Sequence, residues 1–265
     1  MTTAVPMSLL SDTATVGVDG SLFVGGCSVS ELAATYGTPL FVYDEDHLRA
    51  RCREAVQAFG RRNVVYASKA FLCKAMALLA YEEGLLLDVA TGGELHIVLA
   101  AGVPASACVM HGNNKSVQEL RQAITAGVHH IVVDSFDEMD RLDSLHGEGL
   151  PCPDVLLRIT PGVHAHTHEF IATGQDDSKF GFNLGNGDAA RAVDRATNSA
   201  SMRLVGLHCH IGSNVFEASS FAKAAEVMAK FADPFGLPEL VLGGGLGVAY
   251  TSGEEAPTIA HWGNV

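Results

Sequence analysis

Long apolar runs and positive charge are both scarce in this 265-residue sequence. No apolar run reaches the roughly 18 residues that a membrane-spanning helix needs, so we expect no membrane span. The 17 Lys and Arg residues are outnumbered by 30 Asp and Glu residues, which gives a formal net charge of −13. That charge argues against a nucleic-acid or anionic-membrane partner, because either would need a basic patch. It still permits a local basic pocket for an anionic cofactor.

The sequence also lacks closely spaced cysteines and a recognisable secretion signal. Its six cysteines include no C-x-x-C pair and are widely scattered: Cys27, Cys52, Cys73, Cys108, Cys152 and Cys209. The first 16 residues contain no basic region followed by an apolar stretch. In a chain of this length without such a signal, scattered cysteines indicate thiols rather than disulfides. We therefore expect buried free cysteines in a cytoplasmic protein.

Apolar residues are plentiful, at 48% of the sequence against 18% charged residues. This composition supports a large core and argues against wholesale disorder. The length allows one large domain or two small ones. We expect residues 1–36 to form a segment of their own, with a short strand and turn over 21–27 and a short helix over 29–36. Residues 37–265 then form the main domain.

From residue 38 onwards, short apolar segments alternate with helical patterns. The apolar segments are continuous, which is typical of strands buried on both faces of a parallel sheet. Units of about 20 to 25 residues predict a (β/α) barrel or a doubly wound sheet. We expect strands over 39–43, 63–67, 85–89, 107–110, 130–133, 154–159, 203–208 and 239–242. Counted from 63–67 there are seven, one fewer than a closed barrel needs, so we expect an incomplete barrel.

Lys69 comes just after the predicted strand 63–67, at the point where the chain should turn into a loop. Desolvation disfavours the ammonium form of lysine. A lysine that emerges from a buried strand into a pocket can therefore be nucleophilic near pH 7 and form a Schiff base. The same position also suits a simple solvated strand end. The residues at the other strand ends decide between these interpretations.

Polar residues and glycines follow the other predicted strands, and in a barrel those ends converge on one mouth. Pyridoxal phosphate requires such a convergence of groups. A lysine forms an imine with the cofactor, an imidazole lies against its pyridine ring, and a hydroxyl and glycine amides bind its phosphate. The pattern predicts such a site, with no metal. Its candidate residues are Lys69, Asp88, His111, Arg158, His210, Ser213, and Gly244 and Gly245 of the glycine run 243–247.

Several of these features have other interpretations. Asp88 could be a helix cap. Arg158 inside a buried strand is costly unless it is paired, which favours a role in the site. The glycine run lacks the G-x-G-x-x-G spacing of a dinucleotide loop. A metal site is a weaker alternative, since His164, His166 and His168 share one face of an extended segment but no carboxylate or thiolate lies at ligand spacing.

Taken together, these segments resemble the pyridoxal-phosphate-dependent decarboxylases with an alanine-racemase-like barrel, and among them the diaminopimelate decarboxylases. The similarity runs from residues 38–44 to the glycine run. It implies that Lys69 carries the imine and that His210 stacks on the pyridine ring, both as catalytic residues. It also implies that Ser213, Gly244 and Gly245 bind the phosphate.

Two further stretches indicate the diaminopimelate branch, namely residues 111–116 and 164–181. By this resemblance the histidine-rich part of the second stretch is a lid over the active site and not a metal site. Asp88 and Arg158 are expected among the cofactor contacts. The substrate is then a small diamino acid.

The implied reaction converts meso-2,6-diaminopimelate to L-lysine and carbon dioxide in lysine biosynthesis, by an enzyme that is a homodimer when full length. Family members continue past Val265 with an eighth strand and a β-rich domain, against which the counterpart of residues 1–36 packs. We therefore expect an incomplete (β/α)8 barrel that is inactive alone. Two alternatives stay open: a decarboxylase of another basic amino acid, of the ornithine or arginine type, and a non-catalytic pyridoxal-phosphate-binding fragment.

Overall fold

The computed structural model describes residues 6–163 and 179–265 of the chain. The histidine segment with His164, His166 and His168, which we interpreted as a lid or a metal site, lies outside these residues. Among the described helices, none is long and apolar enough to cross a bilayer. The six cysteines are all free; Cys52, Cys108 and Cys209 are buried as expected, whereas Cys27 and Cys152 are exposed.

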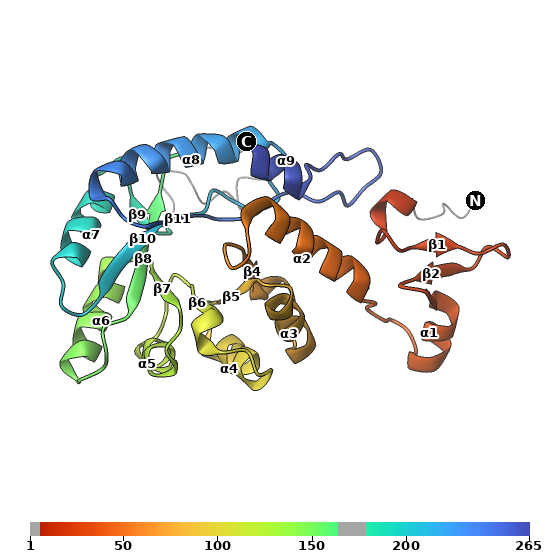
Figure 1. The fold of residues 1–265 in the computed structure, drawn as a ribbon, viewed down its shortest axis with the longest axis horizontal. Helices are drawn as coiled ribbons and strands as arrows, with labels where there is room; N and C mark the ends of the chain where they lie inside the picture. Colours follow the sequence, from red (N-terminus) through yellow and green to blue (C-terminus); the bar gives the residue numbers. More distant parts are fainter. Residues whose placement is uncertain (1–5, 164–178) are drawn as a thin grey trace.

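A curved sheet of parallel strands forms the centre of the molecule (Figure 1). Its strands follow one another in space in the same order as in the chain. They are β4 (Val65–Ala67), β5 (Leu86–Val89), β6 (Cys108–Met110), β7 (His130–Val133), β8 (Asp154–Thr160), β10 (Arg203–Cys209) and β11 (Glu239–Leu242). A short strand, β9 (Phe182–Asn183), pairs with β8 outside this path. A doubly wound sheet would reverse its strand order at a switch point, so the uninterrupted order selects the barrel.

The sheet is a half-barrel, because β4 and β11 are its two edges within the described residues. Its central strands are mostly apolar, and all residues of β6 and β7 are buried. Continuous apolar runs suit strands that pack on both faces. The prediction of seven parallel strands in an incomplete barrel is thus confirmed.

Helices follow the strands and cover the outer face of the sheet (Figure 1). Their ends carry the expected signals: Asp44 accepts a hydrogen bond from the amide of His47, and Gly127 ends α5 in the left-handed conformation, at φ 74°. The helices are α2 (Glu45–Phe59), α3 (Lys74–Glu82), α4 (Gly92–Ala100), α5 (Val117–Ala126), α6 (Phe136–Gly147), α7 (Asp188–Thr197), α8 (Ala218–Ala232) and α9 (Ile259–Asn264).

The short helix α9 was not predicted, and it bridges the helices beside the opening of the sheet. The ring of Trp262 lies edge-on to Phe59 of α2, with centroids 5.0 Å apart, and 5.2 Å from the ring of Phe221 of α8. The helical layer is therefore continuous where the sheet is open. A six-residue helix gives too short a periodic pattern to be found from sequence.

The first residues form a separate small unit at the side of the barrel (Figure 1). After a 3-10 turn, Met7–Leu9, the antiparallel strands β1 (Thr15–Val16), β2 (Leu22–Val24) and β3 (Cys27–Ser28) lead into α1 (Val29–Tyr36). The predicted strand over 39–43 is wrong. Residues 40–43 form no strand and are exposed, and Tyr43 stacks on Phe71 with centroids 3.9 Å apart. An apolar run alone does not make a strand, because a strand also needs a neighbour to bond with.

Candidate functional site

Lys69 lies directly after β4, in the 3-10 turn Ser68–Ala70. The prediction that a strand ends here is confirmed, but the expected desolvation of the lysine is not found, because Lys69 is exposed. Lys69 follows β4, which is an edge strand of the sheet within the described residues. Among the described residues Lys69 has no ion-pair partner. Its amine is therefore available to an incoming group.

Asp88 lies near the end of the neighbouring strand β5 and is partly buried. Burial raises the pKa of this carboxyl to about 7, and the nearby positive charges of Lys69 and Arg158 partly oppose that rise. The interpretation of Asp88 as a helix cap is wrong, because Thr91 caps α4. Asp88 is thus an acid beside Lys69 that can gain or lose a proton near neutral pH.

Arg158 projects from β8 and forms an ion pair with Asp134, at 3.2 Å between Nη1 and Oδ1. Its guanidinium also lies over the ring of Phe180, 4.5 Å from the centroid. Asp134 in turn accepts a hydrogen bond from the amide of Gly181 at 3.1 Å. Burial lowers the pKa of Arg158, and Asp134 counteracts this. The buried arginine is paired, as the cost of an unpaired charge requires.

Three imidazoles lie among these charged groups. His111 and His208 meet edge to face, with ring centroids 4.9 Å apart. Burial lowers the pKa of His111 to about 3 and that of His210 to about 4, and it lowers the pKa of His208 well below its usual range. All three rings are therefore neutral at neutral pH. The Nδ1 atom of His208 is buried and has no hydrogen-bond partner within the described residues.

The three glycines after β11 have different surroundings. A side chain on Gly245 would lie 2.0 Å from the carbonyl oxygen of Gly212, and one on Gly243 would lie 2.6 Å from Nδ1 of His210. Gly244 faces open space, because nothing among the described residues lies within 4 Å of its missing side chain. The backbone of the run is fixed to the segment after β10, since Val215 donates a hydrogen bond to the carbonyl of Gly245 at 2.8 Å. Gly244 is therefore the residue at which a ligand can approach the backbone.

Ser213 follows β10 in the same segment and is exposed at this end of the sheet. The structure thus brings the predicted residues from β4, β5, β8, β10 and β11 to the carboxyl ends of one sheet. Their chemistry fits pyridoxal phosphate in three respects. Lys69 supplies an accessible amine, and Gly244 leaves the backbone amides open to a phosphate. The buried Nδ1 of His208 has no hydrogen-bond partner among the described residues, so a polar group of a ligand could bind it.

A buried ion pair supports the site and was missed from the sequence. The ammonium of Lys115 contacts Oε1 of Glu138 at 2.8 Å and donates to the carbonyls of Gly112 at 2.6 Å and Val132 at 2.7 Å. These bonds join the loop that follows His111 to β7 and α6. Lys115 is one of the largest fully buried side chains. The sequence shows Lys115 at the end of the loop 111–115, but it does not show that Glu138, 23 positions later, is its partner.

Asp134 was also missed, although it comes directly after the buried strand β7 just as Asp88 comes near the end of β5. No group of three or more His, Cys, Asp or Glu side chains within the described parts of the chain is arranged to hold a metal ion.

Comparison with known proteins adds independent findings. Residues 45–265 match the family described as pyridoxal-dependent decarboxylase, pyridoxal binding domain. The diaminopimelate decarboxylase of Mycobacterium tuberculosis strain H37Rv is 49% identical over 253 residues, which are 91% of this chain and 57% of that protein. The enzyme of the same name from Bacillus subtilis is 49% identical over 246 residues, 89% of this chain and 56% of that protein. The chain therefore spans somewhat more than half the length of these relatives.

A solved structure gives the same result for the fold. The crystal structure of diaminopimelate decarboxylase from M. jannaschii in complex with L-lysine matches with a TM-score of 0.85 and 31% sequence identity. The match covers 96% of this chain and 61% of that chain.

Proposed function

Because this chain belongs to the pyridoxal-dependent decarboxylases and contains their pyridoxal-binding domain, we propose that it is the cofactor-binding portion of a diaminopimelate decarboxylase. One observation carries the proposal. One end of the half-barrel brings together the accessible Lys69, the acid Asp88 with a pKa of about 7, and the neutral imidazole of His210. The chain that carries them is 49% identical to a diaminopimelate decarboxylase.

The proposed reaction is the decarboxylation of meso-2,6-diaminopimelate to L-lysine, as in lysine biosynthesis. Bound pyridoxal phosphate supplies an electron sink for the negative charge that remains when carbon dioxide leaves. The M. jannaschii enzyme is in complex with L-lysine, which supports this substrate over ornithine or arginine. A homodimer of the full-length protein, in the cytoplasm, is part of the same proposal.

Each candidate residue has a proposed role. The Lys69 amine holds the cofactor covalently, and Asp88 beside it exchanges protons near pH 7. His210 is proposed to lie against the cofactor ring as a neutral imidazole, since burial lowers its pKa to about 4. Arg158, held by Asp134, keeps a positive charge at the base of the site.

The phosphate is proposed to lie between Ser213 and the glycine run, with Gly244 giving access to backbone amides and Gly245 fixing the backbone. Residues 1–36 are proposed to pack against further protein in the full-length enzyme, since their strands β1 to β3 form a unit beside the barrel.

Borohydride trapping tests the role of Lys69. The purified chain is mixed with pyridoxal phosphate, reduced with borohydride and mapped by peptide mass spectrometry. We expect the label on Lys69, and its loss in Lys69→Ala with retention in Lys74→Ala, a nearby lysine at the start of α3. Label on another lysine would show that the cofactor site is elsewhere.

Substrate preference is measured by absorbance on the same chain with pyridoxal phosphate bound, and it needs no turnover. Addition of meso-diaminopimelate should change the absorbance of the bound cofactor at lower concentration than ornithine or arginine does. Equal responses to all three would favour a broader basic-amino-acid decarboxylase. Cofactor binding with no response to any diamino acid would favour the non-catalytic alternative.

A further inference from the structure

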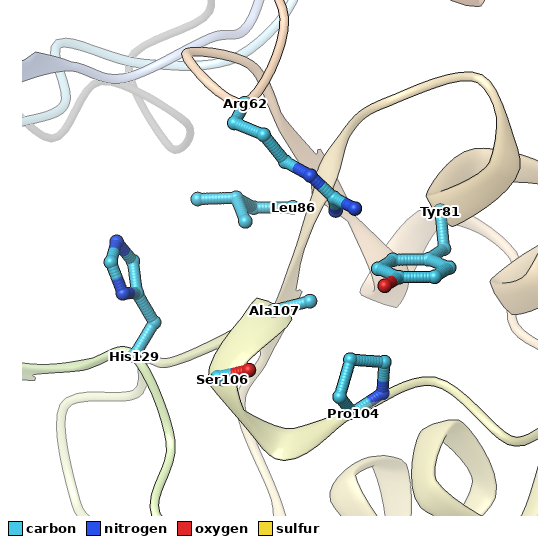
Figure 2. A pocket seen from close by; sticks show the side chains of 7 residues that line it. All are labelled: Arg62, Tyr81, Leu86, Pro104, Ser106, Ala107 and His129. Carbon is cyan, nitrogen blue, oxygen red and sulfur yellow. The ribbon is translucent and has the colours of Figure 1, made fainter.

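A second pocket lies at the opposite end of the strands from the candidate cofactor site. Its volume is about 250 Å³, and its lining comes from the amino ends of β5, β6 and β7, the segment before β4, and α3: Arg62, Tyr81, Leu86, Pro104, Ser106, Ala107 and His129 (Figure 2). Parallel strands run in one direction, so these amino ends face away from Lys69 and Asp88. The proposed function does not use this pocket.

Arg62 gives the pocket a positive charge that no carboxylate neutralises. It forms no ion pair within residues 6–163 and 179–265. Its Nη1 donates to the carbonyl of Leu85 at 3.0 Å, and its guanidinium lies 4.2 Å from the centre of the Tyr81 ring. These contacts fix the side chain without cancelling its charge, and most of its N–H donors stay available.

A larger pocket at the same end of the sheet provides a contrast. Its volume is about 540 Å³ and Arg203 lies in its lining, but Nε and Nη2 of that guanidinium donate to the two carboxylate oxygens of Asp154. The positive charge of Arg203 is therefore already satisfied. Of these two pockets, the one at Arg62 combines a fixed arginine with no acidic partner among the described residues.

The rest of the smaller pocket combines polar groups with apolar surface. Figure 2 shows Arg62 reaching across toward Tyr81, with His129 on the opposite side and Leu86 between them. Ser106 and His129 add a hydroxyl and an imidazole, and Leu86 and Pro104 add apolar surface. A volume of about 250 Å³ is below the roughly 300 to 1,000 Å³ typical of pockets for drug-sized ligands, which suits a small ligand.

We propose that this pocket binds a small organic anion. A carboxylate or phosphate group on the ligand would pair with Arg62, whose planar fork matches either group. Ser106 and His129 would bind its remaining oxygens, and a short apolar body would lie against Leu86 and Pro104. The ligand would occupy the base of the barrel while the cofactor occupies the mouth.

The test is a titration of the purified, ¹⁵N-labelled chain with sodium glutarate and, separately, with sodium phosphate, at constant ionic strength. We expect saturable shifts of the backbone amides of Ser106, Ala107 and His129, with a dissociation constant of about 1 to 10 mM for at least one anion. Saturation by glutarate alone identifies a carboxylate ligand, and saturation by phosphate alone identifies a phosphate ligand.

Two variants make the result specific. Arg62→Gln should weaken binding at least about tenfold, whereas Arg61→Gln, an exposed neighbour outside the lining, should leave it unchanged. Amides of residues 243–245 report the cofactor end, and their unchanged positions in both variants show that the fold is intact. No saturable shift up to about 100 mM of either anion, or equal binding by Arg62→Gln, would overturn the proposal.

Discussion

Gly243, Gly244 and Gly245 are adjacent in the sequence, but the structure gives their missing side chains different surroundings. From the sequence alone, nothing distinguishes the three as parts of a phosphate cradle. In the structure, Gly243 and Gly245 are glycine because neighbouring atoms occupy the space of a side chain. Gly244 is open, so only there does the absence of a side chain serve a ligand.

We therefore predict different effects of valine at the two positions. Gly244→Val should weaken binding of pyridoxal phosphate at least about tenfold with little change in thermal stability. Gly245→Val should lower the stability itself by about 1 to 3 kcal/mol or more, because Gly245 has φ 108° and its side chain would meet the carbonyl of Gly212. Cofactor titration and thermal unfolding separate the two effects. Unchanged cofactor affinity in Gly244→Val would show that the phosphate does not bind at the glycine run.

Asp88 is one of the residues whose titration should link stability to pH. Its pKa is raised to about 7 in the folded chain, mainly by burial, against an ordinary value of 3.8. The folded state therefore holds a proton that the unfolded state releases. Between these two values each rise in pH favours the unfolded state, so the stability present below about pH 4 is lost progressively up to about pH 7.

Asp88→Asn should remove this dependence. The gain in free energy of unfolding of Asp88→Asn over the wild-type chain should be about 2 to 3 kcal/mol larger at pH 8 than at pH 5. The reason is that Asp88 in the folded chain loses most of its proton between those two pH values. Urea unfolding at both pH values measures the difference. Asp46→Asn on the exposed start of α2 is the control and should show no such change. An equal effect of Asp88→Asn at both pH values would contradict the raised pKa.

At the scale of elements, the Lys115–Glu138 pair connects the β6–α5 loop to α6. Both side chains are buried, at 0% and 3% exposure, so neither charge is solvated except by its partner and the backbone. Burial raises the pKa of Glu138, and the adjacent Lys115 ammonium opposes this. Removing one partner leaves a charge without compensation inside the core.

Lys115→Met should lower the free energy of unfolding by about 3 to 5 kcal/mol, and the double variant with Glu138→Leu should recover much of that loss. The exposed pair Arg121–Glu148 offers a matched control, and Arg121→Met should cost less than about 1 kcal/mol. Urea unfolding of the wild type, Lys115→Met, Glu138→Leu and the double variant gives the coupling energy. Strict additivity of the two core changes would show that the pair contributes no interaction.

At the scale of the whole molecule, the open sheet determines how the chain is expected to behave in solution. The edge strands β4 and β11 each have one side without a strand partner within the described residues, and Lys69 follows one of them. Unpaired strand edges promote association between chains. The exposed apolar segment 40–43 adds to this tendency, with Phe41 at 88% exposure.

We predict that this chain alone is not an active decarboxylase. An assay of carbon dioxide release from meso-diaminopimelate, with saturating pyridoxal phosphate, should give a rate far below ordinary enzymes. Size-exclusion chromatography of the same sample should show association. Turnover of about one per second or more would show that the half-barrel is a complete catalyst.

The sequence by itself determined a parallel sheet built from repeated βα units and the candidate residues at the strand ends, whereas the strand order selected the barrel. It could do so because strands buried on both faces are continuous apolar runs, and a polar residue directly after such a run must lie at the sheet's edge. Lys69 and Asp88 were found this way, whereas Arg158 was found as a charged residue inside a buried strand. The count of seven strands followed from the same pattern.

Only the tertiary structure decided which residues meet. The pairs Arg158–Asp134 and Lys115–Glu138 join residues more than twenty positions apart, and local patterns hold no information about such contacts. The same is true of the unpaired segment 39–43, the helix α9 over the sheet opening, and the exposure of Lys69. Each depends on what packs beside a segment, and a neighbour that is distant in the chain is placed by the fold and not by the local sequence.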